Sequence, residues 1–571
     1  MVLWTSERAK ERAEEVLFMG GKRVKKKERK TETLLLGRKK KVVHANEVQG
    51  EARKTDGFRK AFGREIGSWE KNKAMRRVKK EQWMKPLGTR TLYTWKEVEE
   101  EVAERGKLEK CRVRIQGCND PEKDRLSCSS PTVSKTSWRM AVIISVMYGW
   151  QSNSLDIKTA FLQGVPLTRL VHVFPPKDAN EMAGIVWLLL KAVYGLVDAP
   201  DHWYRRVVQI LVEELGMVKC PWDGGLFILK KGGELKGILS THVDDFWWAG
   251  SEEMAGLVEA VGEKVEVGSE KKGGSFLYAG LRISDEEWEG QDAKYVDMDH
   301  YIDGLEVAEL PVGKDGMTLD LDEVLDDAGQ TVLRGKVGET LWVGTSCRAD
   351  VTAKVSMVAG WLGKGRVREL VQINKLIEHL KKTRFRMRFP KLGRNLALEV
   401  YNDSAFGNLP DGGLQGGFII LVRDTVSGLF CPLSWASRKL RRVTRSTIAA
   451  ETEAMVEGID EGVFLGHIWD WIFEGIMPSI GMQVYTDCKS LYDHLKGKGG
   501  PTAEKRLRIS MSSILEDLTE GKITDFNWIV SEDMLADGLT KDMSPHALVR
   551  AFRESRTEVR MGLKGRINRG E

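Results

Sequence analysis

The sequence predicts an α+β protein that is divided into several domains. Its 571 residues are enough for roughly three to five domains of ordinary size. A Gly232-Gly233 turn joins two β-rich runs, which is typical of a β-hairpin. Beyond Asn395, three strand candidates precede a long helix candidate, and strands then alternate with helices, as in a mixed α/β domain. The composition, 42% apolar and 30% charged, excludes a fibrous or wholly disordered chain.

Apolar spacing and turn residues predict the elements one by one. In the first 390 residues we expect, in order, a buried helix at Trp138–Trp150, a strand within 185–196, a helix within 202–215, hairpin strands at Leu226–Lys230 and Gly237–Val243, a β run at Phe246–Trp248, and helices over 300–390 that are basic toward their end. After Asn395 we expect strands at Leu396–Tyr401, Gly416–Val422, Leu429–Trp435, Met482–Thr486 and Ile523–Val530. The helices expected between them are Ser446–Trp471, Ser490–Leu495 and Glu504–Leu518.

The N-terminal residues 1–85 are predicted to be a basic arm without folded structure. Residues 1–80 contain 25 Lys and Arg against 11 Asp and Glu, whereas the whole chain has a net charge of only +6. Such an arm attracts polyanions, usually nucleic acid, or it is simply a solvated leader. It shows no regular apolar period, so we expect folded structure to begin near Trp83.

The cysteines and the apolar runs indicate an intracellular protein. The seven cysteines are widely spaced and form no C-x-x-C pair, so a disulfide scaffold and a zinc knuckle are not expected. No apolar run approaches the roughly 18–20 residues that span a bilayer, and no secretory signal opens the chain. We therefore expect a protein that is neither secreted nor bound to a membrane.

The first candidate site is the adjacent pair Asp244 and Asp245 at the tip of a predicted hairpin. Two hard cations held roughly 4 Å apart can activate an attacking oxygen and neutralise a leaving one. Mg²⁺ prefers oxygen ligands, and Asp156, at the end of another apolar segment, would complete a set of three carboxylates. The alternative for this short motif is an ordinary turn, because Asp favours turns.

A second carboxylate set lies in the C-terminal part. Asp403 ends the first strand candidate, Asp487 ends the fourth, and Asp537 follows the last. The long helix offers Glu451 and Glu453. Its apolar stripe consists of Ile448, Met455, Ile459 and Val463. Glu451 lies on this stripe, whereas Glu453 is about 200° further round the helix. An acid on an apolar face needs a partner, so we choose Glu451. The alternative is a glutamate that the helix dipole stabilises.

Five sequence blocks together resemble the reverse transcriptase of copia-type LTR retrotransposons. They are Asp156–Gly164, Leu190–Tyr204, Thr241–Gly250, Phe276–Ile283 and Leu333–Val351, the last with Arg348-Ala349-Asp350. The resemblance covers roughly residues 108–390. Beyond it, Ser434–Lys439, Ala536–Lys541 and the order of the second carboxylate set resemble the RNase H domain of the same family.

The resemblance implies a right-hand polymerase followed by an RNase H-like mixed α/β domain. The implied division is a basic arm (1–85), fingers and palm (86–300), a helical thumb or connection (301–395), the RNase H-like domain (396–545) and a basic C-terminal tail (546–571). No protease or integrase block precedes residue 100, so we expect a polyprotein fragment, a processed product or a gene model that begins late.

The resemblance also assigns roles to individual residues. The implied catalytic, metal-binding residues are Asp156, Asp244 and Asp245 in the palm and Asp403, Glu451, Asp487 and Asp537 in the RNase H-like domain. Each site would hold two Mg²⁺ ions, with Mn²⁺ as an alternative. The implied nucleotide-binding residues are Lys110, Arg112, Arg114, Phe161, Tyr194 and Gly195. Phe161 would screen the sugar 2′ position, unless it is an ordinary core residue. The basic strand would grip the triphosphate, unless it is a solvated face.

The implied function is RNA-directed DNA polymerase with RNase H activity. Its partners would be an RNA template, a DNA primer, an RNA–DNA hybrid and dNTPs, in a cytoplasmic particle or the nucleus. His242 and Asp198 depart from the family pattern, as do Arg508, Ile509 and Ser510. The alternatives are therefore a catalytically decayed or host-retained nucleic-acid-binding relic, and a protein in which only the RNase H half is active.

Overall fold

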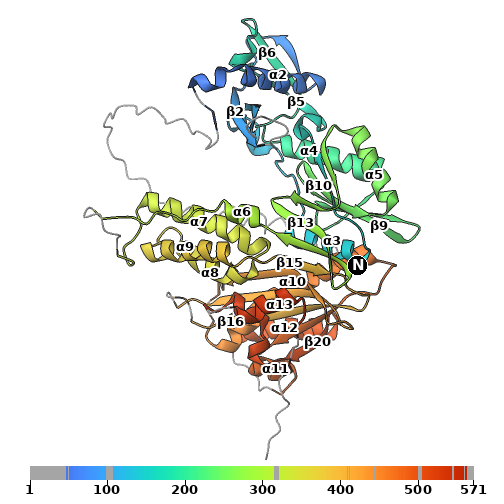
Figure 1. Cartoon of the computed structure of the whole chain (residues 1–571), viewed down its shortest axis with the longest axis vertical. Coiled ribbons are helices and arrows are strands. Elements are labelled where there is room, and N and C mark those ends of the chain that lie inside the picture. The colour runs from blue at the N-terminus through green and yellow to red at the C-terminus, as the bar shows by residue number, and fades with distance from the viewer. Residues whose placement is uncertain are drawn as a thin grey trace, which may run out of the picture.

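The structure is a computed structural model with five β-sheets in the part of the chain that it describes. The described residues are 47–48, 50–97, 107–313, 320–407, 409, 412–442, 444–498, 504–542, 545–557 and 560–561. Figure 1 shows an elongated molecule with α2 and β6 at one end and α11 and β20 at the other. The layer of helices α7, α8 and α9 lies between these ends, on one side.

The fingers region contains two small sheets and one long helix. The first sheet has the order β1 (Met75–Lys79), β6 (Ile185–Lys191), β5 (Pro166–Val173), and β2 (Thr89–Glu97) pairs with β3 (Lys107–Ile115) in the second. Helix α2 (Asp56–Lys71) packs on β3 and buries Phe58, Ala61, Glu65 and Trp69. The predicted beginning of order near Trp83 is therefore wrong. The buried residues of α2 recur at steps of three and four, a helical period that its basic face obscures. Residues 1–46 of the predicted arm lie outside the described residues.

The palm sheet has six strands and carries the first candidate site. Its order is β11 (Val267–Lys272), β4 (Asn153–Ile157), β10 (Asp245–Gly250), β9 (Glu234–His242), β8 (Leu226–Lys231) and β7 (Val218–Lys219). Its helices are α3 (Lys135–Met147), α4 (Ala199–Val208) and α5 (Glu252–Lys264). The predicted buried helix and the predicted β8–β9 hairpin are confirmed. Because β10 lies between β4 and β9, the hairpin turn meets the end of β4.

A four-stranded sheet and a helical layer connect the palm to the C-terminal part. The sheet has the order β12 (Ser275–Tyr278), β13 (Leu281–Trp288), β14 (Gln291–Asp297) and β15 (Met387–Pro390). The helices are α6 (Asp299–Asp303), α7 (Asp327–Ser346), α8 (Ala349–Ala359) and α9 (Val367–Lys382). Arg348 makes a double hydrogen bond with Asp350 at 2.8 Å, and both side chains are buried. Arg348 and Asp350, which belong to the Leu333–Val351 block, therefore have a packing role at the start of α8.

The C-terminal sheet has the order β18 (Phe430–Lys439), β17 (Gln415–Asp424), β16 (Leu396–Ala405), β19 (Gly481–Thr486) and β20 (Ile523–Trp528). The first three strands are antiparallel, and β16, β19 and β20 are parallel. The helices are α10 (Thr447–Phe473), α11 (Lys489–Leu495), α12 (Lys505–Thr519) and α13 (His546–Glu554). This succession of strands and helices is the predicted one. The basic tail predicted at 546–571 is wrong in its first part, because α13 buries Leu548 and Phe552; residues 562–571 lie outside the described residues.

The remaining helical segments are short. They are the 3₁₀ helices η1 (Gly50–Lys54), η2 (Gly117–Asn119), η3 (Lys123–Arg125), η4 (Ala160–Gln163), η5 (Lys177–Ala179), η7 (Ser531–Asp533) and η8 (Leu535–Leu539), and the π-helix η6 (Gln209–Glu214) that extends α4. Among the helices that the structure describes, none combines the length and apolar character needed to cross a membrane.

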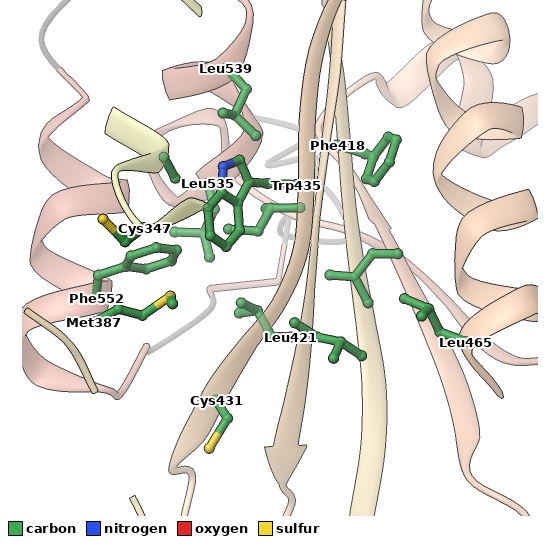
Figure 2. Packing of buried hydrophobic residues seen from close by; sticks show 14 of the residues in the cluster. Cys347, Met387, Phe418, Leu421, Cys431, Trp435, Leu465, Leu535, Leu539 and Phe552 are labelled. Carbon is green, nitrogen blue, oxygen red and sulfur yellow. The ribbon is translucent and has the colours of Figure 1, made fainter. Parts of the chain in front are cut away.

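One hydrophobic core joins the palm, the connecting layer and the C-terminal domain. It runs from Trp138 of α3 to Phe552 of α13. In Figure 2, Cys347, Met387 and Phe552 gather with Trp435 on one side of the C-terminal sheet, and Phe418 and Leu465 lie on the other. Such a shared core fixes the palm and the C-terminal sheet relative to each other, because close-packed interiors resist deformation.

Candidate functional site

The turn between β9 and β10 presents Asp244 and Asp245 in a strained backbone. Val243 has φ +60°, which is costly for a β-branched residue. Two hydrogen bonds hold this conformation. The indole Nε1 of buried Trp203 donates to the Val243 carbonyl at 2.7 Å, and the Ile157 amide donates to the Asp244 carbonyl at 2.8 Å. The turn is thus tied to α4 on one side and to the end of β4 on the other.

Asp156 lies directly opposite Asp245 in the β4–β10 pairing. Burial, together with the charges of Asp156 and Asp244, raises the pKa of Asp245 to about 6. The hydrogen bond from the Ala279 amide lowers this pKa and so opposes part of the shift. Burial and the charge of Asp244 also raise the pKa of Asp156, while nearby cations lower it. The strand register therefore brings the three predicted carboxylates into electrostatic contact.

The carboxylates of Asp245 and Asp156 nevertheless have different neighbours. Asp245 Oδ2 accepts from the Ala279 amide at 3.1 Å, and Asp156 Oδ2 faces Gly268 on β11, where an added Cβ would lie 2.4 Å from it. Within the described ranges, they are not among the carboxylates whose oxygens gather within 4.8 Å of one another. Neither Gly268 nor Ala279 was predicted as a site residue. The β4–β11 pairing places Gly268 beside Asp156, whereas Ala279 lies in the turn after β12 and reaches Asp245 through its amide.

Cationic side chains of the fingers face the palm carboxylates. Lys110, Arg112 and Lys96 all lower the pKa of Asp156. Burial lowers the pKa of Lys110, as do the charges of Arg112 and Lys96, while the charge of Asp244 raises it. Lys96 on β2 was missed because only pairing with β3 places it beside the predicted strand. Arg114 also lies on β3, at a position that pairs with Arg90.

The remaining predicted nucleotide residues lie between the fingers and the palm. The rings of Phe161 and Tyr194 meet edge to face, with centroids 5.3 Å apart, and the Arg112 guanidinium lies 4.5 Å from the Tyr194 ring. Gly195 has φ +94°, and a Cβ there would lie 2.2 Å from the Ile115 carbonyl oxygen. Only glycine permits this approach of the chain to β3.

The two palm departures from the family pattern leave the carboxylates in place. His242 is exposed at the end of β9. Asp198 accepts two hydrogen bonds from Arg169, at 3.0 and 3.2 Å, and Arg169 also pairs with Asp120 at 2.8 Å. Asp198 thus belongs to a buried ion-pair network at the start of α4.

The second candidate site lies where β16 and β19 run side by side. Carboxylate oxygens of Asp403, Asp487 and Asp537 all lie within 4.8 Å of one another. Asp403 is near the end of β16 and is only 2% exposed, and Asp487 directly follows β19. Parallel strands end at the same edge of a sheet, which explains why residues far apart in the sequence meet. Hard divalent cations favour such an all-oxygen set.

Glu451 faces this carboxylate set, and Glu453 does not. Burial, with the charges of Asp403 and Asp487, raises the pKa of Glu451 to about 9. Glu453 instead accepts from Arg442 at 3.0 Å and from Ser510 Oγ of α12 at 3.4 Å. The two glutamates therefore lie on different sides of α10, as the apolar stripe predicts. Ser510, one of the departures from the family, belongs to the Glu453 side.

Lys541 and Thr540 also contact the second site, although neither was predicted as a site residue. Lys541 Nζ lies 2.6 Å from Asp537 Oδ1 and 3.7 Å from Asp403 Oδ2. Thr540 Oγ1 donates to Asp403 Oδ2. Burial and the charge of Asp403 raise the pKa of Asp537 to about 7, although Lys541 opposes the shift. The signal in the sequence was the spacing of four from Asp537 to Lys541.

The first of these sites lies in a segment that matches a known protein family. Residues 72–270 match the family described as "Reverse transcriptase (RNA-dependent DNA polymerase)", and this range contains Asp156, Asp244 and Asp245. Residues 72–270 thus match a reverse transcriptase family, and the chain is similar to copia-type retrotransposon Pol polyproteins. The matched range also contains the predicted nucleotide residues, whereas the second carboxylate set lies beyond residue 270.

Curated relatives extend the similarity over more of the chain. It is 24% identical over 454 residues to the Retrovirus-related Pol polyprotein from transposon RE1 of Arabidopsis thaliana, covering 76% of this chain and 29% of the relative. The polyprotein from transposon RE2 of the same plant is also 24% identical, over 76% of this chain and 30% of the relative. The putative transposon Ty5-1 protein YCL074W of Saccharomyces cerevisiae is 25% identical over 51% of this chain and 94% of its own length. This chain thus spans less than a third of the RE1 and RE2 polyproteins.

Solved structures similar to this chain include two of the foamy viral protease-reverse transcriptase. One, a dRH form in complex with ds DNA, has a TM-score of 0.48 and 13% identity, covering 82% of this chain and 69% of that chain. The other, in complex with an RNA/DNA hybrid, has a TM-score of 0.43 and 11% identity, covering 83% of this chain and 54% of that chain.

Proposed function

We propose that this chain is an RNA-directed DNA polymerase with RNase H activity in its C-terminal domain. The observation that carries the proposal is the pairing of Asp156 with Asp245 beside Asp244, within a reverse transcriptase domain. The cluster of Asp403, Asp487 and Asp537 supports the second activity. The proposed partners are an RNA template, a DNA primer, an RNA–DNA hybrid and dNTPs.

In the palm, the primer 3′-hydroxyl would attack the α-phosphate of a dNTP and release pyrophosphate. Asp156, Asp244 and Asp245 would hold two Mg²⁺ ions, which supply charge neutralisation at the attacking and leaving oxygens. Lys110 and Arg112 would contact the triphosphate, because they lie close enough to Asp156 for their charges to lower its pKa. Phe161 would exclude a sugar 2′-hydroxyl from its position beside Tyr194.

In the C-terminal domain, water would attack a phosphodiester of the RNA strand of a hybrid. Asp403, Glu451, Asp487 and Asp537 fit divalent ions because all four offer oxygen ligands, Asp403 is buried and the other three are half-buried. The protein would read the heteroduplex by its shape and backbone, since A-like helices hide their base edges.

Primer extension on primed poly(rA) with dTTP and Mg²⁺ tests the polymerase. The wild-type protein should incorporate dTTP, and the double variant D244N/D245N should not. Folding of the variant is checked by circular dichroism and thermal melting. Failure of a folded wild type that binds the template would contradict polymerisation and favour the binding-only or RNase H-only alternative.

A pair of single variants tests the division of labour between the two sites. D245N should abolish extension and leave cleavage of a labelled RNA–DNA hybrid intact, and D403N should do the reverse. The two carboxylate sets belong to different sheets, so neither substitution alters the other set directly. Loss of both activities in a folded single variant would overturn this division.

A further inference from the structure

Lys541 places a cation inside the second carboxylate cluster. Its ammonium lies 2.6 Å from Asp537 Oδ1 and 3.7 Å from Asp403 Oδ2, and its side chain is 36% exposed. The backbone holds the lysine there, because the Lys541 amide donates to the Asp537 carbonyl at 3.1 Å. Asp403 meanwhile accepts from Thr540, the neighbouring residue.

The ammonium of Lys541 lies where a divalent ion bound by both Asp403 and Asp537 would have to lie. Mg²⁺ binds carboxylate oxygens at roughly 2.0–2.1 Å. An ion shared by Asp403 and Asp537 would therefore lie next to the ammonium, and two cations so close repel each other. The partial exposure of Lys541 gives its long side chain a route out of the cluster toward solvent.

We propose that Lys541 is a built-in counter-ion of the RNase H site that must leave the Asp403–Asp537 pair before a divalent cation binds there. The inference rests on the proposed RNase H function. While the lysine is in place, it offsets the repulsion among the three aspartates. When an ion binds, the displaced ammonium is free to contact a phosphate of the hybrid. Ion and hybrid therefore favour each other's binding through one side chain.

Mg²⁺ titration calorimetry of the full chain tests the competition. The palm is silenced with D244N/D245N so that the heat reports the C-terminal site. K541M should bind Mg²⁺ about tenfold more tightly than the parent, because the competing cation is gone. K541R should retain weak binding. K489M is the matched control, since Lys489 lies two residues after Asp487 and its ammonium stacks on Trp528 at 5.5 Å.

The second arm measures the coupling to nucleic acid. The probe is a short hybrid whose RNA strand is 2′-O-methylated, with its integrity checked on a gel. A saturating amount should tighten Mg²⁺ binding by the parent about five- to tenfold, and K541M should show no such gain. Melting curves in EDTA provide a fold check: K541M should melt below the parent in EDTA and regain the difference in Mg²⁺.

The outcomes separate this inference from the proposed function. Unchanged or weaker Mg²⁺ binding by folded K541M would overturn the counter-ion role, as would coupling that persists without Lys541. If the parent binds no Mg²⁺ that D403N removes, the RNase H proposal itself fails. Tighter binding by K541M together with lost coupling would establish the inference.

Discussion

Asp245 at the start of β10 lies directly opposite Asp156 at the end of β4. The pairing places carboxylates from distant sequence blocks on adjacent strands, with Asp244 in the turn beside them. Three like charges so close raise each other's cost of ionisation unless cations compensate. This arrangement supports the proposed phosphoryl transfer over a purely structural turn.

Trp203 is expected to hold the palm turn for catalysis. W203F removes the indole donor to the Val243 carbonyl and leaves a partly buried acceptor unpaired, at a cost of about 1 kcal/mol. We expect primer extension to fall between about ten- and a hundredfold, because the carboxylates lose their fixed position. Hybrid cleavage should not change. W248F is the control, because Trp248 is equally buried and its indole nitrogen has no hydrogen-bond partner among the described residues.

Glu451 and Glu453 offer a matched pair of substitutions on one helix. E451Q should reduce hybrid cleavage by at least about a hundredfold, because it removes a charged ligand from the cluster. E453Q should retain cleavage, since Glu453 contacts Arg442 and Ser510 instead. Initial cleavage rates of a labelled hybrid decide the matter. Equal cleavage rates for the two variants would contradict the assignment of Glu451 to the second site.

Metal-free stability should depend on pH through the second site. Burial raises the pKa of Glu451 to about 9 and that of Asp537 to about 7, whereas unfolded carboxyls titrate near pH 4. Between about pH 4 and pH 9 the folded state holds more protons than the unfolded state, so stability falls as pH rises. In EDTA, the melting temperature of the wild type should fall more steeply with pH than that of E451Q.

Mg²⁺ should reverse this trend, because the ion binds the deprotonated carboxylates. Its apparent affinity for the second site should increase as pH rises through the pKa of Asp537. Melting curves of wild type and E451Q that stay parallel across the pH range would contradict the assignment of the shift to Glu451.

Arg139 is expected to link the palm to the C-terminal sheet. Its buried guanidinium donates to the carbonyls of Thr345, Ser346 and Leu433 and lies 3.8 Å from the Trp435 ring. R139M leaves these buried acceptors unpaired and should destabilise the protein by about 3 kcal/mol or more, measured by urea unfolding. R64M is the control, because Arg64 donates to one carbonyl on the surface.

The same link predicts how the chain unfolds. Because one core spans the palm and the C-terminal domain, both activities should be lost in a single transition of the wild type. Separate transitions for primer extension and hybrid cleavage would show that the shared core does not couple the two parts.

The sequence by itself predicted the succession of elements after Asn395 and the members of both candidate carboxylate sets. Asp156, Asp244, Asp403 and Asp487 could be found because each ends an apolar run, a pattern that local periodicity reveals. The apolar stripe of α10 likewise distinguished Glu451 from Glu453. Short-range spacing carries this information, because strands and helices repeat every few residues.

Only the tertiary structure decided which distant residues meet. Lys96 faces Asp156 through β2–β3 pairing, Gly268 makes room for the Asp156 carboxylate, and Lys541 enters the Asp403 cluster. The helix α2 was missed because its basic face masks a buried apolar face. Contacts of this kind depend on strand order and on burial against other elements. The residue spacing within a single segment determines neither of these.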